Sequence, residues 1–345
     1  MRNARVEIEP STVERVPWVA GSRRGNIDDR KLREVEVSVL PQICPLRPVI
    51  PSRLSVELDL ACEEIATLDR AYSAVLRPLA ALLLRAESVA SSKIEDINAD
   101  LDDYARALHG SKENSSAVAM VASTDALRDL IESVDAGAEI AWGHIAASHR
   151  TLMSADPSER HYAGRVRDMQ NWIGGSDYSP IGALYVPPRP EAVAGHLADL
   201  MDFCNRRDLH PIVQASIAHA QFESIHPFTD GNGRIGRALV NTILRRRRIT
   251  TGVVVPIASA IVARRDDYFD ALAAHRAGDG GPLILAFAVG ARIAAAESRI
   301  SAVRLAEMPD RWVEQAGSPR LGSGARKLIA KFPASPVFSA DELEL

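Results

Sequence analysis

The segment from His226 to Arg237, HPFTDGNGRIGR, constrains the fold more than any other part of the chain. Apolar residues recur at helical spacing on both sides of it, over residues 211–225 and again from Ile235 to Ile243. Between these two runs, glycines at 231 and 233 can adopt positive φ without steric cost. The sequence therefore predicts two helices joined by a tight loop that opens directly into the second helix.

Such a loop has the chemistry of a phosphate site. Backbone N–H groups in a glycine nest and the positive end of the following helix both attract an anion. Arg234 and Arg237 lie three residues apart and can both reach phosphate oxygens. Asp230 offers a hard oxygen ligand for Mg²⁺, and His226 could accept a proton from an attacking hydroxyl group. Taken singly, these features are also typical of a surface turn, a helix cap or a solvated arginine face, but their combination favours a nucleotide site.

The same twelve residues resemble the signature of the Fic family, His-x-Phe-x-(Asp/Glu)-Gly-Asn-Gly-Arg-x-x-Arg, at every specified position. Fic proteins are mostly α-helical enzymes that transfer AMP from ATP to a hydroxyl group of a target protein. The resemblance covers about residues 140–296. It implies a mostly α fold, a Fic-type helical bundle with a short β-hairpin flap, and a protein adenylyltransferase that uses ATP and Mg²⁺.

The resemblance also implies roles for individual residues. His226 would be the general base, Asp230 would hold Mg²⁺, and Phe228 would anchor the loop in the core. Arg237 would lie near the γ-phosphate. The remaining contacts to the nucleotide phosphates would come from the start of the second helix, at Gly231, Asn232, Gly233, Arg234, Ile235, Gly236 and Arg237.

A second motif lies upstream, in Ser91-Ser-Lys-Ile-Glu95-Asp96. It resembles the (Ser/Thr)-x-x-x-Glu-(Gly/Asn) motif of self-inhibited Fic proteins, whose glutamate occupies the second arginine of the loop motif and excludes a productive γ-phosphate. The resemblance implies that Ser91 and Glu95 are inhibitory and that Glu95 pairs with Arg237. Asp96 departs from the pattern at a position where glycine would let the helix end tightly. The residues alone also allow a capping box of Ser92 and Glu95 at the start of a helix.

Two further segments are expected near the nucleotide. Residues 172–188 combine turn formers with a short apolar run, and they occupy the position of the family's flap, a hairpin that covers the nucleotide and clamps an extended target segment. The segment 264–272 resembles the family's aromatic pair, of which Tyr268 would line the base pocket, although an ordinary amphipathic helix explains it almost as well. The flap residues expected nearest the nucleotide are Gly182, Ala183, Leu184 and Tyr185.

Composition limits the other functions that the chain could have. The formal net charge of −4 gives no reason to expect a nucleic-acid or acidic-membrane surface. The basic cluster Arg245 to Arg248 follows a helix and suits its negative end, so we interpret it as a solvated helix end. Three scattered cysteines favour neither a disulfide framework nor a zinc site. Because the N-terminus lacks the apolar core of a secretion signal and no apolar stretch is long enough for a bilayer, we expect a soluble, cytoplasmic protein.

Helical periodicity predicts most of the chain organisation. The chain begins with a loop-rich arm that contains a strand-like piece at 34–40. We expect helices over 55–108, with interruptions near Pro78 and Ser91. Further helices are expected over 118–134, 139–152, 191–205 and 211–225. We divide the chain into an N-terminal helical region that carries the inhibitory motif (1–116), a Fic catalytic core (117–296) and a C-terminal helical tail (297–345). In the tail, 325–331 reads as a helix and 339–342 as a capping box that opens another. We therefore expect the start of a winged helix, either truncated here or lost in a natural variant.

Several alternatives remain open at this stage. The chain could be a regulator whose core senses a nucleotide and which binds a partner protein, or DNA if a winged helix follows. The intact His226 argues against a pure sensor, which needs no base. Among enzymes, removal of AMP and donors other than ATP, phosphocholine donors included, stay open. The target would be a protein with a Ser, Thr or Tyr hydroxyl group, and self-modification and a homodimer are further options.

Overall fold

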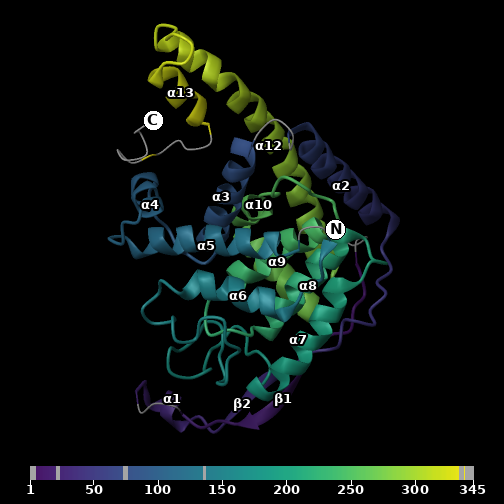
Figure 1. Ribbon diagram of the computed structural model, residues 1–345. Helices are drawn as coiled ribbons and strands as arrows, with labels where there is room; N and C mark the ends of the chain where they lie inside the picture. The colour runs from purple at the N-terminus through teal and green to yellow at the C-terminus, as the bar shows by residue number, and fades with distance from the viewer. Residues whose placement is uncertain (1–4, 21–23, 73–76, 135–136, 334–337, 339–345) are drawn as a thin grey trace.

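The computed structural model describes residues 5–20, 24–72, 77–134, 137–333 and 338. The chain is mostly helical, as predicted (Figure 1). The N-terminal arm contains β1 (Thr12–Pro17), α1 (Ile27–Lys31) and β2 (Glu34–Val39). The helices that follow are α2 (Ser52–Tyr72), α3 (Arg77–Ile94), α4 (Leu101–Leu108), α5 (Ser115–Glu132), α6 (Trp142–Met153), α7 (Pro190–Asn205), α8 (Pro211–Ile225), α9 (Asn232–Arg246), α10 (Ile257–Val262), α11 (Arg265–Arg276), α12 (Gly281–Gln315) and α13 (Gly324–Lys331).

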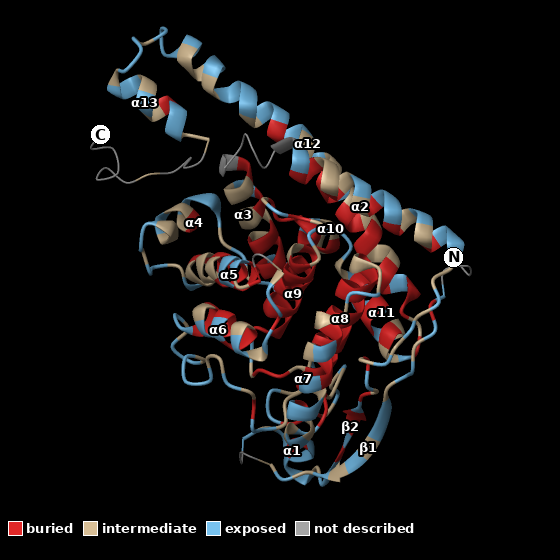
Figure 2. Cartoon of the chain, turned by 45° about the vertical axis from the view of Figure 1, so that its right-hand side comes forward, coloured by how far each residue is buried: buried red, intermediate tan, exposed pale blue. Residues whose placement is uncertain are grey.

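Helices α8 and α9 form the centre of the molecule. Every residue from Ile212 to Ile225 is buried, and so are all residues of α9 except Arg245. Helix α8 packs against α7, α9 and α12, while α9 also packs against α3 and α5, so that neither helix keeps a solvent-facing side (Figure 2). A helix that is enclosed in this way needs no polar stripe, which explains why most residues of α8 are apolar or small.

One hydrophobic core joins the N-terminal helices to the rest of the chain. It runs from Val6 through Leu58 of α2 and Ile94 of α3 to Ala302 of α12. Helix α12 is continuous through residue 296, where the sequence placed the boundary between core and tail, and its first half packs along α2. Beyond this contact α12 extends away from the body and is largely exposed (Figures 1 and 2).

The β-structure lies mainly in the N-terminal arm. The predicted strand at 34–40 is β2, and it pairs antiparallel with β1, which the sequence analysis missed, in the register Thr12↔Val39 to Pro17↔Glu34. The predicted flap contains one isolated antiparallel bridge, Ile173↔Tyr185, and no strand. The two regions meet where the Ser38 N–H donates to the Val186 carbonyl at 3.0 Å. The arm therefore lies beside the end of the flap.

The predicted helices over 118–134, 139–152, 191–205 and 211–225 are confirmed as α5, α6, α7 and α8, with ends that differ by at most three residues. The helix predicted over 325–331 is α13, whereas the capping box predicted at 339–342 lies outside the described residues. None of the helices in the described residues combines the length and the hydropathy that a bilayer crossing requires.

Candidate active site

The loop between α8 and α9 is closed by its own side chains. His226 ends α8 with a left-handed φ of 49°, and Gly231 begins α9 with a φ of 73°. Asn232 then clamps the backbone of Phe228, since its Oδ1 accepts from the Phe228 N–H and its Nδ2 donates to the Phe228 carbonyl, both at 2.9 Å. The Phe228 ring is fully buried, as the sequence predicted, and stacks on His149 at 3.6 Å between ring centroids. The loop is thus held in place by contacts within the chain.

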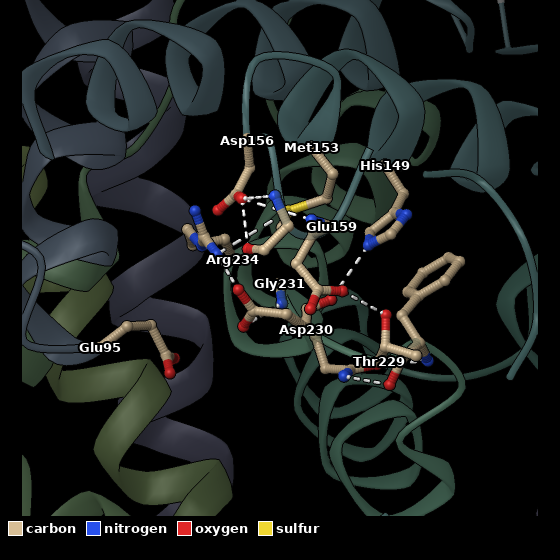
Figure 3. Close-up of polar contacts among 12 residues, drawn as sticks. Glu95, His149, Met153, Asp156, Glu159, Thr229, Asp230, Gly231 and Arg234 are labelled. Atoms are coloured by element: carbon tan, nitrogen blue, oxygen red, sulfur yellow. Dashed lines mark hydrogen bonds and ion pairs between the residues drawn. The ribbon is translucent and has the colours of Figure 1, made fainter. Parts of the chain in front are cut away.

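His149, on α6, holds the same loop from the other side (Figure 3). Its Nδ1 accepts from the Gly164 N–H at 2.8 Å, so Nε2 must carry the proton that it shares with the Asp230 carbonyl at 3.0 Å. Burial lowers the pKa of His149 to about 4, which keeps this neutral tautomer in place at neutral pH. The sequence analysis missed this residue, because a single histidine about eighty residues upstream of the loop forms no local pattern.

His226 is held as a neutral imidazole. Burial, together with the charges of Arg167 and Arg276, lowers the pKa of His226 to about 4. Its Nδ1 is buried and has no hydrogen-bond partner among the described residues. Arg167 fixes the backbone here, since its Nε donates to the His226 carbonyl at 2.8 Å and its Nη2 donates to the Pro188 carbonyl at 2.5 Å. Arg167, which the sequence analysis also missed, therefore ties the histidine to the base of the flap.

Arg237 is paired with the upstream motif. It is buried, and its Nη2 lies 2.7 Å from Oε1 of Glu95. Ser91 adds two contacts, because its Oγ accepts from Arg237 Nε at 2.8 Å and its carbonyl accepts from Nη2 at 2.9 Å. Partial burial would raise the pKa of Glu95, but the positive charges of Arg237 and Arg234 outweigh it and hold the pKa below its ordinary value. The pair is therefore ionised at neutral pH.

The carboxylate of Glu95 also lies against the glycine nest. A β-carbon placed on Gly233 would overlap Oε1 of Glu95, so only glycine admits the carboxylate at this point. In the view of Figure 3, Glu95 and His149 lie on opposite sides of the loop. The Glu95 carboxylate thus lies directly beside Gly233 at the start of α9.

Helix α3 ends at this contact, which excludes the capping-box interpretation of Ser92 and Glu95. The motif lies at the C-terminus of α3, where a capping box has no free N–H groups to satisfy. Instead the Ile97 N–H donates to the Ser92 carbonyl and the Asp96 N–H to the Lys93 carbonyl, at 3.1 Å each. This is the Schellman pattern, and Asp96 provides its left-handed residue with a φ of 59°. Asp96 thus adopts the conformation for which the family pattern uses glycine or asparagine.

Asp230 and Arg234 lie at the outer edge of the loop. Oδ1 of Asp230 accepts from the Gly231 N–H at 2.6 Å, and Oδ2 lies 3.3 Å from Arg234 Nη2. The Asp230 side chain is 55% exposed, whereas Arg234 is buried and its Nε has no hydrogen-bond partner among the described residues. Within the described part of the chain no group of three or more His, Cys, Asp or Glu side chains could hold a metal ion. Asp230 is therefore a single, half-exposed carboxylate whose two oxygens contact the Gly231 N–H and Arg234.

Two other predicted α9 residues serve packing. Ile235 is buried in the core. Gly236 allows α8 and α9 to approach closely, because a β-carbon there would lie 2.6 Å from Oε1 of Glu223. Burial raises the pKa of Glu223 to about 7. This face of α9 thus points into the core and away from the surface of the loop.

The flap residues divide into anchored and exposed ones. Tyr185 is anchored, since its hydroxyl donates to the Ser224 carbonyl at 2.8 Å and its ring lies 3.7 Å from the Arg276 guanidinium. Leu184 is 86% exposed, and Gly182 and Ala183 lie in the turn before it. The structure therefore places Tyr185 against α8 and leaves Leu184 free to contact another molecule.

Tyr268 is buried on α11, behind the loop. Its hydroxyl lies 2.8 Å from Nε2 of His219 on α8, and burial raises the pKa of Tyr268. This contact joins α11 to α8. The structure therefore places Tyr268 in the core, where its hydroxyl also lies beside the guanidinium of Arg237.

Comparison with known protein sequences agrees with this geometry. Residues 140–244 match the model of the Fic/DOC family. Protein adenylyltransferase fic-1 of Caenorhabditis briggsae is 34% identical over 150 residues, which are 42% of this chain and 26% of the relative. Protein adenylyltransferase Fic of Nematostella vectensis is 36% identical over 138 residues, which are 39% of this chain and 28% of the relative. The chain therefore matches about a quarter of the length of these curated relatives.

Solved structures extend the likeness to most of the chain. A Fic family protein from Desulfovibrio desulfuricans G20 superposes with a TM-score of 0.62 over 82% of this chain and 87% of that chain, at 24% identity. A fragment of Fic-1 from Caenorhabditis elegans superposes with a TM-score of 0.55 over 72% of each chain, also at 24% identity. At these identities the likeness concerns the fold, which the chain shares with both proteins.

Proposed function

We propose that the chain, whose residues 140–244 match the model of the Fic/DOC family, is a protein adenylyltransferase of this family that its own Glu95 inhibits. The observation that carries the proposal is the pairing of Glu95 with Arg237 beside the glycine nest of the α8–α9 loop. A carboxylate and a phosphate compete for the same buried guanidinium, so the occupied arginine marks the phosphate site and its inhibitor together.

The proposed reaction transfers AMP from ATP. The hydroxyl oxygen of the target attacks the α-phosphorus, the bond from this phosphorus to the oxygen that bridges to the β-phosphate breaks, and pyrophosphate leaves. His226 accepts the hydroxyl proton, for which a neutral imidazole is required, and its low pKa keeps the imidazole in this form at neutral pH. Arg234, Arg237 and the N–H groups at the start of α9 neutralise the phosphate charge, which together with positioning supplies most of the rate enhancement.

Asp230 fits a role in holding Mg²⁺. Its carboxylate is half-exposed at the edge of the loop, and Mg²⁺ in nucleotide sites takes only one or two carboxylates, with phosphates and water as its other ligands. When bound, the ion would neutralise charge on the same phosphates that Arg234 contacts. A lone carboxylate is consistent with this mode of binding, in which the nucleotide brings most of the ligands.

The flap supports a protein target. Exposed Leu184 and the bridged segment 173–185 offer backbone groups that an extended target segment could join by strand addition. This mode suits a Ser, Thr or Tyr hydroxyl group in a loop of another protein or of a second copy of this chain. The neutral His226 imidazole favours an enzyme over a pure nucleotide sensor, and three free cysteines fit a cytoplasmic protein.

The donor can be identified directly. We expect the Glu95→Gly protein, incubated with Mg²⁺ and each nucleoside triphosphate in turn, to gain the mass of one or more AMP groups with ATP, on itself or on an added target. Intact-mass and peptide mass spectrometry report the donor and the modified residue together. A gain only with another triphosphate, or a loss of mass from a pre-modified target in place of a gain, would contradict the ATP transferase.

The Asp96→Gly substitution is expected to leave the inhibition intact. Glycine adopts the left-handed φ more easily than aspartate, by about 1 kcal/mol, and the ion pair from Asp96 to Arg265 is exposed and contributes little. Helix α3 should therefore end in the same way and keep Glu95 on Arg237. The variant should show wild-type labelling with ATP and an equal or slightly higher midpoint in urea unfolding. Raised labelling would mean that Asp96 itself contributes to inhibition.

A further inference from the structure

A second cluster of positive charge lies at the opposite end of α9 from the loop. A cavity of about 310 Å³ is lined there by Gly137, Arg207, Arg246, Arg247 and Arg248. The sequence suggested a solvated helix end, but this interpretation is wrong for Arg246, which is only 5% exposed. Because α9 has 15 residues that each rise 1.5 Å, the cavity lies about 20 Å from the loop.

Most of the hydrogen-bond donors of the buried Arg246 have no partner in the part of the chain that the structure describes. Nη2 of Arg246 donates to the Asn205 carbonyl at 3.0 Å, but its Nε and Nη1 are buried without a hydrogen-bond partner among the described residues. Arg247 donates to Gln214 and to the carbonyl of Arg207, which are both neutral acceptors. In the described part of the chain no carboxylate forms an ion pair with any of the four arginines that line the cavity. A buried guanidinium without an anion is costly, so an anion from outside would stabilise it.

The positive charges also act on one another. Burial lowers the pKa of Arg246, and the nearby charge of Arg207 lowers it further, against the weaker opposing effect of Glu139. Burial lowers the pKa of Arg247 in the same way, with further contributions from Arg246 and Arg207 that Asp208 opposes. The cluster is therefore short of negative charge even when its acidic neighbours are included.

The backbone holds one of these arginines in an unfavourable conformation. Arg248 has a φ of 57°, a left-handed value for which glycine is the usual choice after a helix end. The Ile249 N–H donates to the Leu244 carbonyl and the Arg248 N–H to the Arg245 carbonyl, which again is a Schellman pattern. A non-glycine residue costs about 1 kcal/mol here, and its side chain points to a role beyond ending the helix.

The helix dipole does not account for the cluster. The C-terminus of a helix carries roughly half a negative charge, which one arginine would satisfy. The four guanidinium groups around the cavity therefore carry about three positive charges more than the helix dipole can account for. The excess is also confined to one concave site in a chain of net charge −4, which fits a compact ligand better than an extended nucleic acid.

We propose that this cavity binds a small molecule that carries two or more phosphate groups. Guanidinium groups match phosphate oxygens in pairs, and a polyphosphate can contact several of them at once. The site is separate from the α8–α9 loop and does not depend on the adenylyltransferase activity proposed above.

Tripolyphosphate is a suitable probe for the intact chain. Calorimetry should detect its binding to the wild-type protein. The double variant Arg207→Ala/Arg248→Ala removes two exposed arginine side chains and leaves the buried Arg246 in place. We expect it to bind at least about tenfold more weakly, as the loss of charge-assisted hydrogen bonds implies. Arg304→Ala, which removes an exposed arginine from the far part of α12, should bind as the wild type does.

Hydrogen exchange separates this site from the loop, which could also bind tripolyphosphate. Protection of residues 205–209 and 245–250 that the double variant loses would support the proposal. Protection only over 226–237, or unchanged affinity of the double variant, would overturn it. Binding of a single-stranded oligonucleotide at this cavity without binding of tripolyphosphate would likewise overturn it, in favour of a nucleic-acid site.

Discussion

Replacement of Glu95 by glycine is expected to raise ATP-dependent labelling by about ten- to a hundredfold. In the wild type, a γ-phosphate must displace the Glu95 carboxylate from Arg237. One such charge-assisted contact contributes about 1.5–3 kcal/mol, which corresponds to this increase in rate. The substitution also clears the space beside Gly233 that the carboxylate now fills. Labelling with radioactive ATP, followed by gel separation, measures the effect.

The neighbouring Asp96→Gly variant is the matched control for this experiment. It removes one carboxylate and introduces one glycine at the same helix end, but it leaves the contact to Arg237 in place. A rise in both variants would point to loosening of the end of α3 as the cause. Equal labelling of wild type and Glu95→Gly would exclude Glu95 as an inhibitor, and near-ultraviolet circular dichroism would establish that the variant is folded.

A decrease in pH cannot release Arg237 from Glu95 under ordinary conditions. The pKa of Glu95 lies below its ordinary value, so the carboxylate stays charged on Arg237 until the pH is lower still. The pKa of His226 is about 4, so the proposed base becomes protonated in the same acidic range. Protonation that freed Arg237 would therefore also disable the base. Release must come from movement of α3 or from a ligand that displaces the carboxylate.

The sequence predicted the loop correctly because its signal is local. The positive φ of Gly231, an anchoring aromatic residue and two helical runs are all encoded within about thirty residues. Gly233 does not use the positive φ that the sequence allowed, because it lies within the first turn of α9. The ends of α7 and α8 were predicted well for a similar reason, since Pro190 and Pro211 begin these helices.

The rest of the site depends on contacts between distant segments. Arg167 and His149 each bind loop carbonyls, but a lone arginine or histidine has no neighbours in sequence that reveal such a partner. The capping-box pattern at Ser92 is equally ambiguous, because the same residues can begin or end a helix. Only the packing of α3 against α9 decides that the helix ends there.

Burial was the least predictable property. Arg246 lies in a run of four arginines, which on its own indicates an exposed helix end, yet the packing of α9 encloses it. Tyr268, which the sequence analysis expected near the nucleotide, is also buried, and its hydroxyl lies beside both His219 and Arg237. Both residues lie on helices whose apolar faces were recognised, but the sequence did not show how far neighbouring helices would cover the edges of these faces.

Replacement of His226 should reduce transfer by about 10²- to 10⁴-fold, the usual contribution of a general base. Asparagine is the better substituent, because it tolerates the left-handed φ of 49° that alanine would strain. The His226→Asn change is best made in the Glu95→Gly background, where the rate is high enough for the loss to be measured. Single-turnover labelling gives the rate, and calorimetry should show that ATP still binds.

The pH dependence distinguishes a base from a structural histidine. With His226 in place, titration of its imidazole should leave the rate unchanged between about pH 8 and 5. The rate should decrease only as the pH approaches 4, because the neutral imidazole is lost there. The His226→Asn variant should lack this acidic decrease. His161→Ala, which removes an exposed histidine outside the loop, should match the parent protein. Transfer at the parental rate in His226→Asn would remove His226 from the role of base and would leave proton acceptance to water.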